Sequence, residues 1–132
     1  MAFKKILIVI FPIFLLAPTS AIANAESVRC STFLDLEREI NKTLPRKIDE
    51  VAELIQLSVT CETSTIKYTK RFLFDKSLLA QGYKSTKQRH HNYLHCGTNG
   101  LAFKDGWTAT DVWLDKDFGY LATFITSPPD CN

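Results

Sequence analysis

The sequence predicts a single α+β domain: a four-stranded antiparallel sheet with both helices on one face, held by two disulfides. Two observations predict this fold. Segments with helical spacing of apolar residues alternate with segments of period two, in the order helix, hairpin, helix, hairpin. Four cysteines also follow an export signal. No repeat, linker or low-complexity tract divides the chain, so residues 26–132 are expected to form one domain around one core.

The first helix is expected from about residue 32 to residue 44. Thr32 followed by Asp35 is a capping signal at its start. Pro45 ends the segment, because proline cannot continue a helix. Between these limits, apolar residues recur at helical spacing: Phe33, Leu36, Ile40 and Leu44.

A β-hairpin is expected next. In its first strand, Ile55, Leu57 and Val59 alternate with polar residues. Residues 62–64 form the turn, and a second alternating run follows it. The apolar members of this second run are Ile66, Tyr68, Phe72 and Phe74.

The second half repeats the order helix, hairpin. A helix is expected from about residue 76 to residue 95, either continuous or broken near Gly82, and residues 96–100 end it. Strands are expected at residues 107–114 and 120–126, joined by a turn at residues 115–119. Pro128 and Pro129 end the last strand.

Residues 1–25 have the organisation of a cleaved secretory signal peptide. Lys4 and Lys5 precede an apolar run, and a segment of small residues ends in Ala23-Asn24-Ala25. The apolar run is about 11 residues long, which is shorter than the ~20 that span a bilayer. We therefore expect a periplasmic or secreted protein with no membrane insertion after cleavage.

The charge balance argues against a nucleic-acid partner. The chain has 16 Lys and Arg against 14 Asp and Glu, and the signal segment holds two lysines and no acid, which leaves 14 of each. Nucleic-acid binding depends on a positive field that neutralises phosphates. A neutral domain lacks that field, so a protein partner is expected instead.

The four cysteines are Cys30, Cys61, Cys96 and Cys131, and an even count in an exported chain indicates disulfides. Sequence alone leaves three pairings open. The expected layout favours Cys30–Cys61, because the first hairpin's tip returns to the start of the first helix. It favours Cys96–Cys131, because the last strand runs back towards the start of its partner strand, near the loop after Cys96. The cysteine spacing contains no C-x2-C pair, so a zinc site is disfavoured.

The stretch RHHNYLHC, residues 89–96, raises the question of a metal site. His91 and His95 are four residues apart and share one helix face, a spacing that binds zinc in H-E-x-x-H enzymes. Here Asn92 follows His91 where such enzymes have glutamate. Solvated histidines at a helix end are the simpler interpretation. These two residues are weak metal candidates, and we expect neither metal nor cofactor.

Other catalytic motifs are incomplete. Asp117-Phe118-Gly119 matches the kinase magnesium motif but has no accompanying glycine-rich loop, so a hairpin turn is expected. Asp111 and Asp115 lack the spacing of a calcium loop. With all cysteines paired, none is a nucleophile. The sequence therefore predicts a protein that is not an enzyme.

Several features resemble a broad group of small exported bacterial proteins. They are Leu44-Pro45 at the end of the first helix, Asp49 before a strand, Tyr68 in the second strand, and the closing stretch WLDKDFGYLATFITSPPDC. The resemblance covers nearly all of residues 26–132. It implies the fold and the Cys96–Cys131 bridge but no activity. The pair Cys30 and Cys61 departs from the group's pattern.

Two function classes fit these observations. The first is a binding module of the immunity or inhibitor type, which neutralises or escorts another exported protein. The alternative is an accessory subunit of an envelope secretion or conjugation apparatus. A small, neutral, disulfide-bonded protein without a catalytic set is what the immunity or inhibitor role requires.

The expected partner surface lies on the second hairpin, where both strand parities carry large apolar residues. If the helices cover one face of the sheet, the apolar residues on the opposite face are exposed. Aromatic residues contribute most of the binding energy in protein interfaces. Trp107, Trp113 and Tyr120 would then bind a partner protein or a second copy in a homodimer. The alternative is that the loop at residues 97–105 folds over this surface and buries it.

Overall fold

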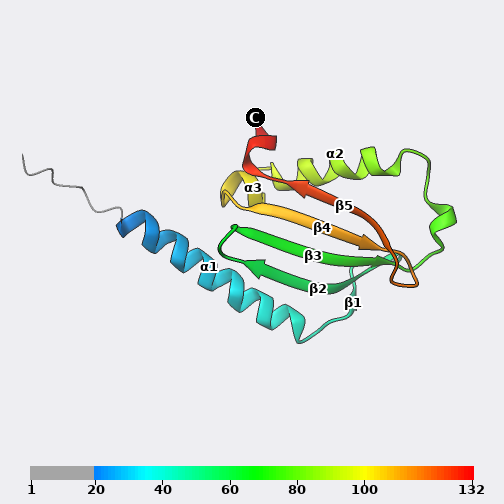
Figure 1. The fold of residues 1–132 in the computed structure, drawn as a ribbon, viewed down its shortest axis with the longest axis horizontal. Helices are drawn as coiled ribbons and strands as arrows, with labels where there is room; N and C mark the ends of the chain where they lie inside the picture. The colour runs from blue at the N-terminus through cyan, green and yellow to red at the C-terminus, as the bar shows by residue number, and fades with distance from the viewer. Residues whose placement is uncertain (1–19) are drawn as a thin grey trace, which may run out of the picture.

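The computed structural model describes residues 20–132 (Figure 1). Residues 1–19 of the expected signal segment lie outside this range. Short 3-10 helices at Lys76–Leu78 and Pro128–Cys131 complete the secondary structure. The main elements are α1 (Ser20–Asn41), β1 (Arg46–Lys47), β2 (Ala52–Thr60), β3 (Thr65–Phe72), α2 (Tyr83–His95), α3 (Leu101–Lys104), β4 (Thr108–Leu114) and β5 (Tyr120–Thr126).

The α+β class is confirmed, but the prediction of four antiparallel strands is wrong. The sheet has five strands in the order β1-β2-β3-β4-β5, and β3 pairs with β4 in parallel. The parallel pair arises because α2 carries the chain back along the sheet before β4 begins, which is how crossover connections join parallel strands. The short strand β1, which pairs with Leu54 and Glu53 of β2, was not predicted.

The two long helices cover the same face of the sheet, at opposite edges (Figure 1). In the register, Ile66 lies beside Ala109, and Ala109 lies beside Thr126, so their side chains share a face. Phe33 and Ile40 of α1 pack against the cluster that contains Ile66. His91 of α2 contacts Thr126. Consequently α1 lies along β2, α2 lies along β5, and the central strands lie between them.

The helix boundaries differ from those expected. α1 begins at Ser20, so Thr32 is internal, and its hydroxyl donates to the Val28 carbonyl rather than capping the start. α2 begins only at Tyr83, because Gly82 interrupts the expected helix with a left-handed φ of 81°. The helix is therefore broken near Gly82, a point that the sequence left open. The four-residue helix α3 was not predicted.

The core consists of two clusters, and each contains one tryptophan. Trp107 is 1% exposed and packs edge-on against Phe33, with 4.7 Å between ring centroids. Trp113 is 7% exposed and stacks on Phe72 at 4.2 Å. The expectation of an exposed surface centred on both tryptophans is wrong, because α1, α2 and α3 lie over the face to which they point. Tyr120, at 67%, is exposed.

Side chains from the long helices close parts of both sheet edges. The Asn41 amide donates to the Leu57 carbonyl at 2.9 Å and accepts from the Leu57 N–H at 3.0 Å. The Glu37 carboxylate accepts from the Val59 N–H at 2.6 Å. On the other edge, Gln88 donates to the Ile125 carbonyl at 2.9 Å. These bonds fix each helix to its strand, because open edge groups need partners.

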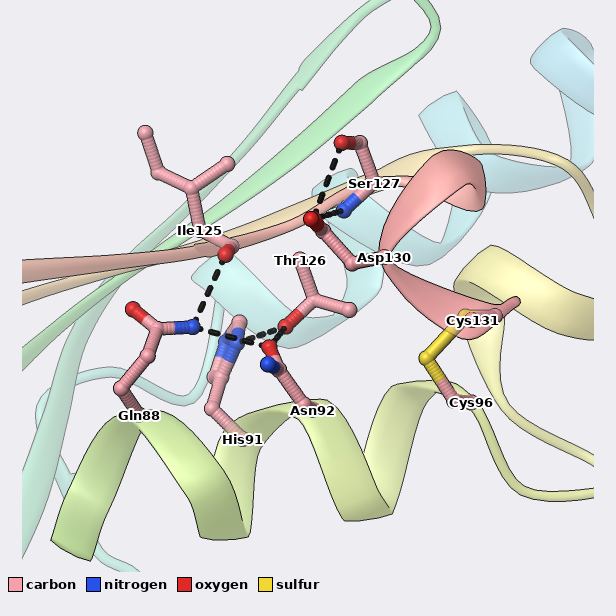
Figure 2. The surroundings of a disulfide bond; sticks show 9 residues. All are labelled: Gln88, His91, Asn92, Cys96, Ile125, Thr126, Ser127, Asp130 and Cys131. Atoms are coloured by element: carbon pink, nitrogen blue, oxygen red, sulfur yellow. Dashed lines mark hydrogen bonds between the residues drawn. A yellow bond between two sulfur atoms is a disulfide. The ribbon is translucent and has the colours of Figure 1, made fainter. Parts of the chain in front are cut away.

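Two disulfides reinforce this arrangement. Cys30 of α1 is joined to Cys61 at the end of β2, and Cys96 after α2 is joined to Cys131 after β5 (Figure 2). The pairing is the one that the sequence layout favours. Among residues 20–132, no helix combines the length and apolar character that a membrane span requires.

Candidate functional site

A chain of buried polar groups crosses the covered face between β3, β4 and α2. The Lys70 ammonium is 2.7 Å from Asp111 Oδ2, and Asp111 Oδ1 is 3.5 Å from His91 Nε2. His91 Nδ1 is 2.7 Å from the Thr126 hydroxyl. His91 is 4% exposed, Asp111 is 6% and Thr126 is 0%. A buried charge needs a partner of opposite charge, and Lys70 and Asp111 provide this for each other.

The direction of the hydrogen bonds assigns the proton on His91. The Thr126 hydroxyl donates to Asn92 Oδ1 at 2.6 Å, so it must accept from His91 Nδ1–H. The Gln88 amide donates to the same Asn92 oxygen and to the Ile125 carbonyl, each at 2.9 Å. Figure 2 shows these side chains bridging α2 and the end of β5, beside the Cys96–Cys131 bond. The helix is thereby fixed on the sheet in position and rotation.

One face of α2 then points toward β1 across a groove. Lys87, His91 and Leu94 are spaced i, i+4, i+7 and therefore lie on one side of the helix. Opposite them is the segment from Arg46 to Asp49. A cavity of about 170 Å³ over Trp113 and a shallower hollow share Ile48 and Lys70. We call the two together the basic groove; its charged and apolar lining includes Arg46, Lys47, Ile48, Asp49, Leu54, Tyr68, Lys70, Lys87, His90, His91, Leu94, Asp111 and Trp113.

Two lysines converge over the Trp113 ring in this groove. The Lys87 ammonium is 4.2 Å from the ring centroid and the Lys70 ammonium is 5.5 Å from it, distances at which a cation is attracted to the ring face. Lys70 is paired with Asp111. Within the part of the chain that the structure describes, Lys87 has no carboxylate oxygen within 4.0 Å.

Burial and charge shift the pKa values around the groove. Desolvation, followed by repulsion from Lys70, lowers the pKa of Lys87. Burial alone would raise the pKa of Asp111, but the interaction with the facing His91 ring and the charge of Lys70 outweigh burial and lower that pKa. Burial, with the nearby Asp111 charge, raises the pKa of Tyr68. Asp111 therefore stays ionised, and its charge is compensated within the protein.

The weak metal candidates His91 and His95 do share a helix face, with 4.5 Å between ring centroids. The simpler interpretation, in which both are solvated, is wrong, because His91 is buried and His95 is half-buried. His91 is buried against Thr126 and Asp111, and His95 stacks near Tyr68 at 6.5 Å. Among the described residues, no group of three or more His, Cys, Asp or Glu side chains could hold a metal ion.

Asp111, His91 and Thr126 are the residue types of a catalytic acid, base and hydroxyl nucleophile, and they follow one another in that order. Their geometry, however, is that of a structural contact between α2 and β5. The Thr126 hydroxyl is fully buried and is engaged by both His91 and Asn92. A nucleophile must reach the substrate and be activated by its base. This threonine reaches only the helix above it, so these contacts hold α2 on β5.

The acidic turn residues have a local role. The Asp115 carboxylate accepts from the backbone N–H groups of Asp117 and Gly119, each at 2.8 Å. These bonds shape the turn between β4 and β5, as expected for residues 115–119.

Sequence reasoning missed Lys70 and Lys87 as site residues. A signal for Lys70 was present, because it has the inward parity of Ile66, Tyr68 and Phe72 in β3. A lysine at an inward position of a strand needs a buried partner. Lys87 carried a weaker signal, since lysines are common on solvated helix faces.

His95 predicts a pH dependence of stability. Burial, followed by repulsion from His91, lowers the pKa of His95 from 6.5 to about 4. The unfolded chain therefore binds this proton at higher pH than the folded protein, so stability is lost as pH falls from about 6.5 toward 4. Because the ring is only half-buried, solvent screening limits the loss to about 1–2 kcal/mol.

Urea denaturation at pH 7.5 and pH 4.5 measures this loss. In His95→Gln, the difference between the two pH values should be smaller by about 1 kcal/mol. Comparing each protein with itself removes the effect of the lost ring contact with Tyr68. Equal pH dependence in both proteins would show that His95 does not contribute.

Comparison with known proteins identifies structural neighbours and no family. No protein-family model matches the sequence, and none of the curated proteins is significantly similar to it. A Pseudomonas aeruginosa protein described as secreted superposes with a TM-score of 0.62 at 14% identity, covering 81% of this chain and 96% of its own. The pilotin EpsS of the Vibrio vulnificus type 2 secretion system superposes with a TM-score of 0.59 at 6% identity, covering 83% and 97%.

At these identities the likeness shows a shared fold. The fold is shared over almost the whole length of both neighbours. The two disulfides indicate an extracytoplasmic location, because disulfides persist in oxidising compartments.

Proposed function

We propose that this protein is a non-enzymatic accessory component of an envelope secretion apparatus and that it binds another protein of that apparatus through the basic groove. The role is supported by the fold shared with a type 2 secretion pilotin. The site is supported by one observation. The groove is open, and its rim carries exposed apolar side chains, Ile48 at 50% and Leu94 at 53%, around buried charge.

A binding role agrees with how the groove is built. Its floor is provided by strands β3 and β4, and its α2 wall is held by the hydrogen bonds to Thr126 and Ile125. A pre-formed wall lowers the conformational entropy lost when a partner binds. Exposed apolar groups beside charged ones provide both affinity and orientation.

The comparisons favour the secretion apparatus over an immunity or inhibitor role. Neither structural neighbour is described as an immunity protein or an inhibitor, and one belongs to a secretion system. The alternative function drawn from the sequence is therefore the one that we propose.

Deletion of the gene in its native host tests the proposed role. The amount of apparatus-dependent exported protein in the culture medium should fall several-fold, and a wild-type copy should restore it. A copy carrying Leu94→Glu should restore less, because the charge is placed on the groove rim. Unchanged export, with deletion cells instead becoming sensitive to one of their own exported toxins or enzymes, would contradict the proposal.

A further inference from the structure

The Lys87 ammonium is an uncompensated cation at the wall of the cavity over Trp113. It is half-buried, 4.2 Å from the Trp113 ring and 5.3 Å from the Phe72 ring. The two carboxylates that line this cavity with Lys87 are used elsewhere. Asp111 binds Lys70, and Asp49 accepts from the Val51 N–H at 2.8 Å. Moving an ammonium out of water is unfavourable unless an anion compensates it.

The charge on the groove as a whole favours an acidic ligand. Its lining holds four side-chain cations, Arg46, Lys47, Lys70 and Lys87, and two carboxylates, Asp49 and Asp111. The surplus is positive although residues 26–132 are neutral overall. A partner with complementary charge is therefore steered to this face.

We propose that the cavity over Trp113 receives a single aspartate or glutamate side chain of the partner protein, which pairs with Lys87 beside Lys70. This proposal rests on the proposed function and names the chemistry of the partner segment. The cavity of about 170 Å³ is large enough for one acidic side chain. Ile48 and Leu94 flank its opening, so the acidic residue should lie between apolar residues.

A singly charged carboxylate fits this cavity better than a phosphate. Asp111 and Asp49 line the same cavity, so a doubly charged anion would meet two like charges there. Lys87 offers one uncompensated positive charge. A carboxylate matches that charge and needs only one or two donors.

Nuclear magnetic resonance of the oxidised protein tests this proposal without the apparatus. The probe is N-acetyl-glutamic acid amide, and N-acetyl-glutamine amide is its neutral analogue. The two tryptophans provide the readout, because the Trp113 indole lies at the cavity and the Trp107 indole lies in the other core cluster. The acidic probe should shift the Trp113 indole signal saturably, leave the Trp107 signal unchanged, and bind at least tenfold more tightly than the neutral probe.

Matched variants assign the effect to Lys87. Lys87→Gln should weaken binding of the acidic probe at least tenfold, Lys87→Arg should retain most of it, and Lys84→Gln, an exposed lysine of the same helix, should leave it unchanged. An unshifted Trp107 signal shows that each variant is folded. Equal binding of the neutral probe, tighter binding of inorganic phosphate, or undiminished binding by Lys87→Gln would overturn the proposal. Because these probes need no apparatus, such a failure is distinguishable from unchanged export after gene deletion.

Discussion

Replacing Trp107 with alanine is expected to lower the free energy of unfolding by about 3–5 kcal/mol, because large core residues leave a cavity that neighbours only partly fill. Trp107 is 1% exposed and packs with Phe33 of α1, Leu57 of β2 and Ile66 of β3. Its removal therefore loosens contacts between a helix and two strands. Urea denaturation followed by circular dichroism measures the change.

Tyr120→Ala is the matched aromatic control. Tyr120 is 67% exposed, and its hydroxyl is hydrogen-bonded to the exposed side of the same strand, to Thr123 at 3.0 Å. Its replacement should change the free energy of unfolding by less than about 1 kcal/mol. Equal losses for the two variants would show that Trp107 does not occupy the core position that the structure gives it.

Asp111→Ala is expected to destabilise the protein by about 3–5 kcal/mol, which is typical when one partner of a buried ion pair is removed. The Lys70 ammonium, 2.7 Å from Asp111 Oδ2, would lose its counter-charge. Urea denaturation at pH 7.5 measures the loss.

Asp117→Ala controls for the change in net charge, because Asp117 is exposed in the turn between β4 and β5. It should alter stability by no more than about 0.5 kcal/mol. A second control is Asp111→Asn, which keeps the shape but removes the charge and should fall between the two. A loss below about 1 kcal/mol in Asp111→Ala would show that the ion pair is not a buried structural element.

The disulfide pairing could be predicted because it depends on element order. Each hairpin follows a helix, so a cysteine near each helix and one in the following hairpin come together whatever the strand directions. Cys30–Cys61 and Cys96–Cys131 both follow from that order. The break at Gly82 was one of two possibilities that the sequence left open, and glycine is favoured at a left-handed φ.

The direction of β4 was not predictable, because alternating apolar residues look the same in parallel and antiparallel strands. The direction of β4 depends on α2, which lies between β3 and β4 in the sequence and carries the chain back along the sheet before β4 begins. Alternation likewise showed that Trp107 and Trp113 share a face, but not which face the helices cover. Only the tertiary structure shows that both point to the covered side.

The basic groove could not be predicted from the sequence for a different reason. Lys70 and Asp111 are 41 residues apart and meet only because β3 and β4 are neighbours. Lys87 joins them from α2, and Ile48 from the turn after β1. Sites assembled from four separate elements leave no local motif in the sequence, so residue spacing could not indicate this one.

The central claim is that the basic groove binds a component of an envelope secretion apparatus, and site-specific photo-crosslinking in the native host tests it most directly. Leu94, 53% exposed on the groove rim, and Ile125, 51% exposed on the uncovered face of the sheet, are matched positions for the photoreactive residue. Crosslinks from position 94 to a secretion-apparatus protein, weakened by Lys87→Gln and absent from position 125, are the predicted result. Capture of the same protein from both positions, or capture of an exported toxin or enzyme from position 94, would contradict the claim.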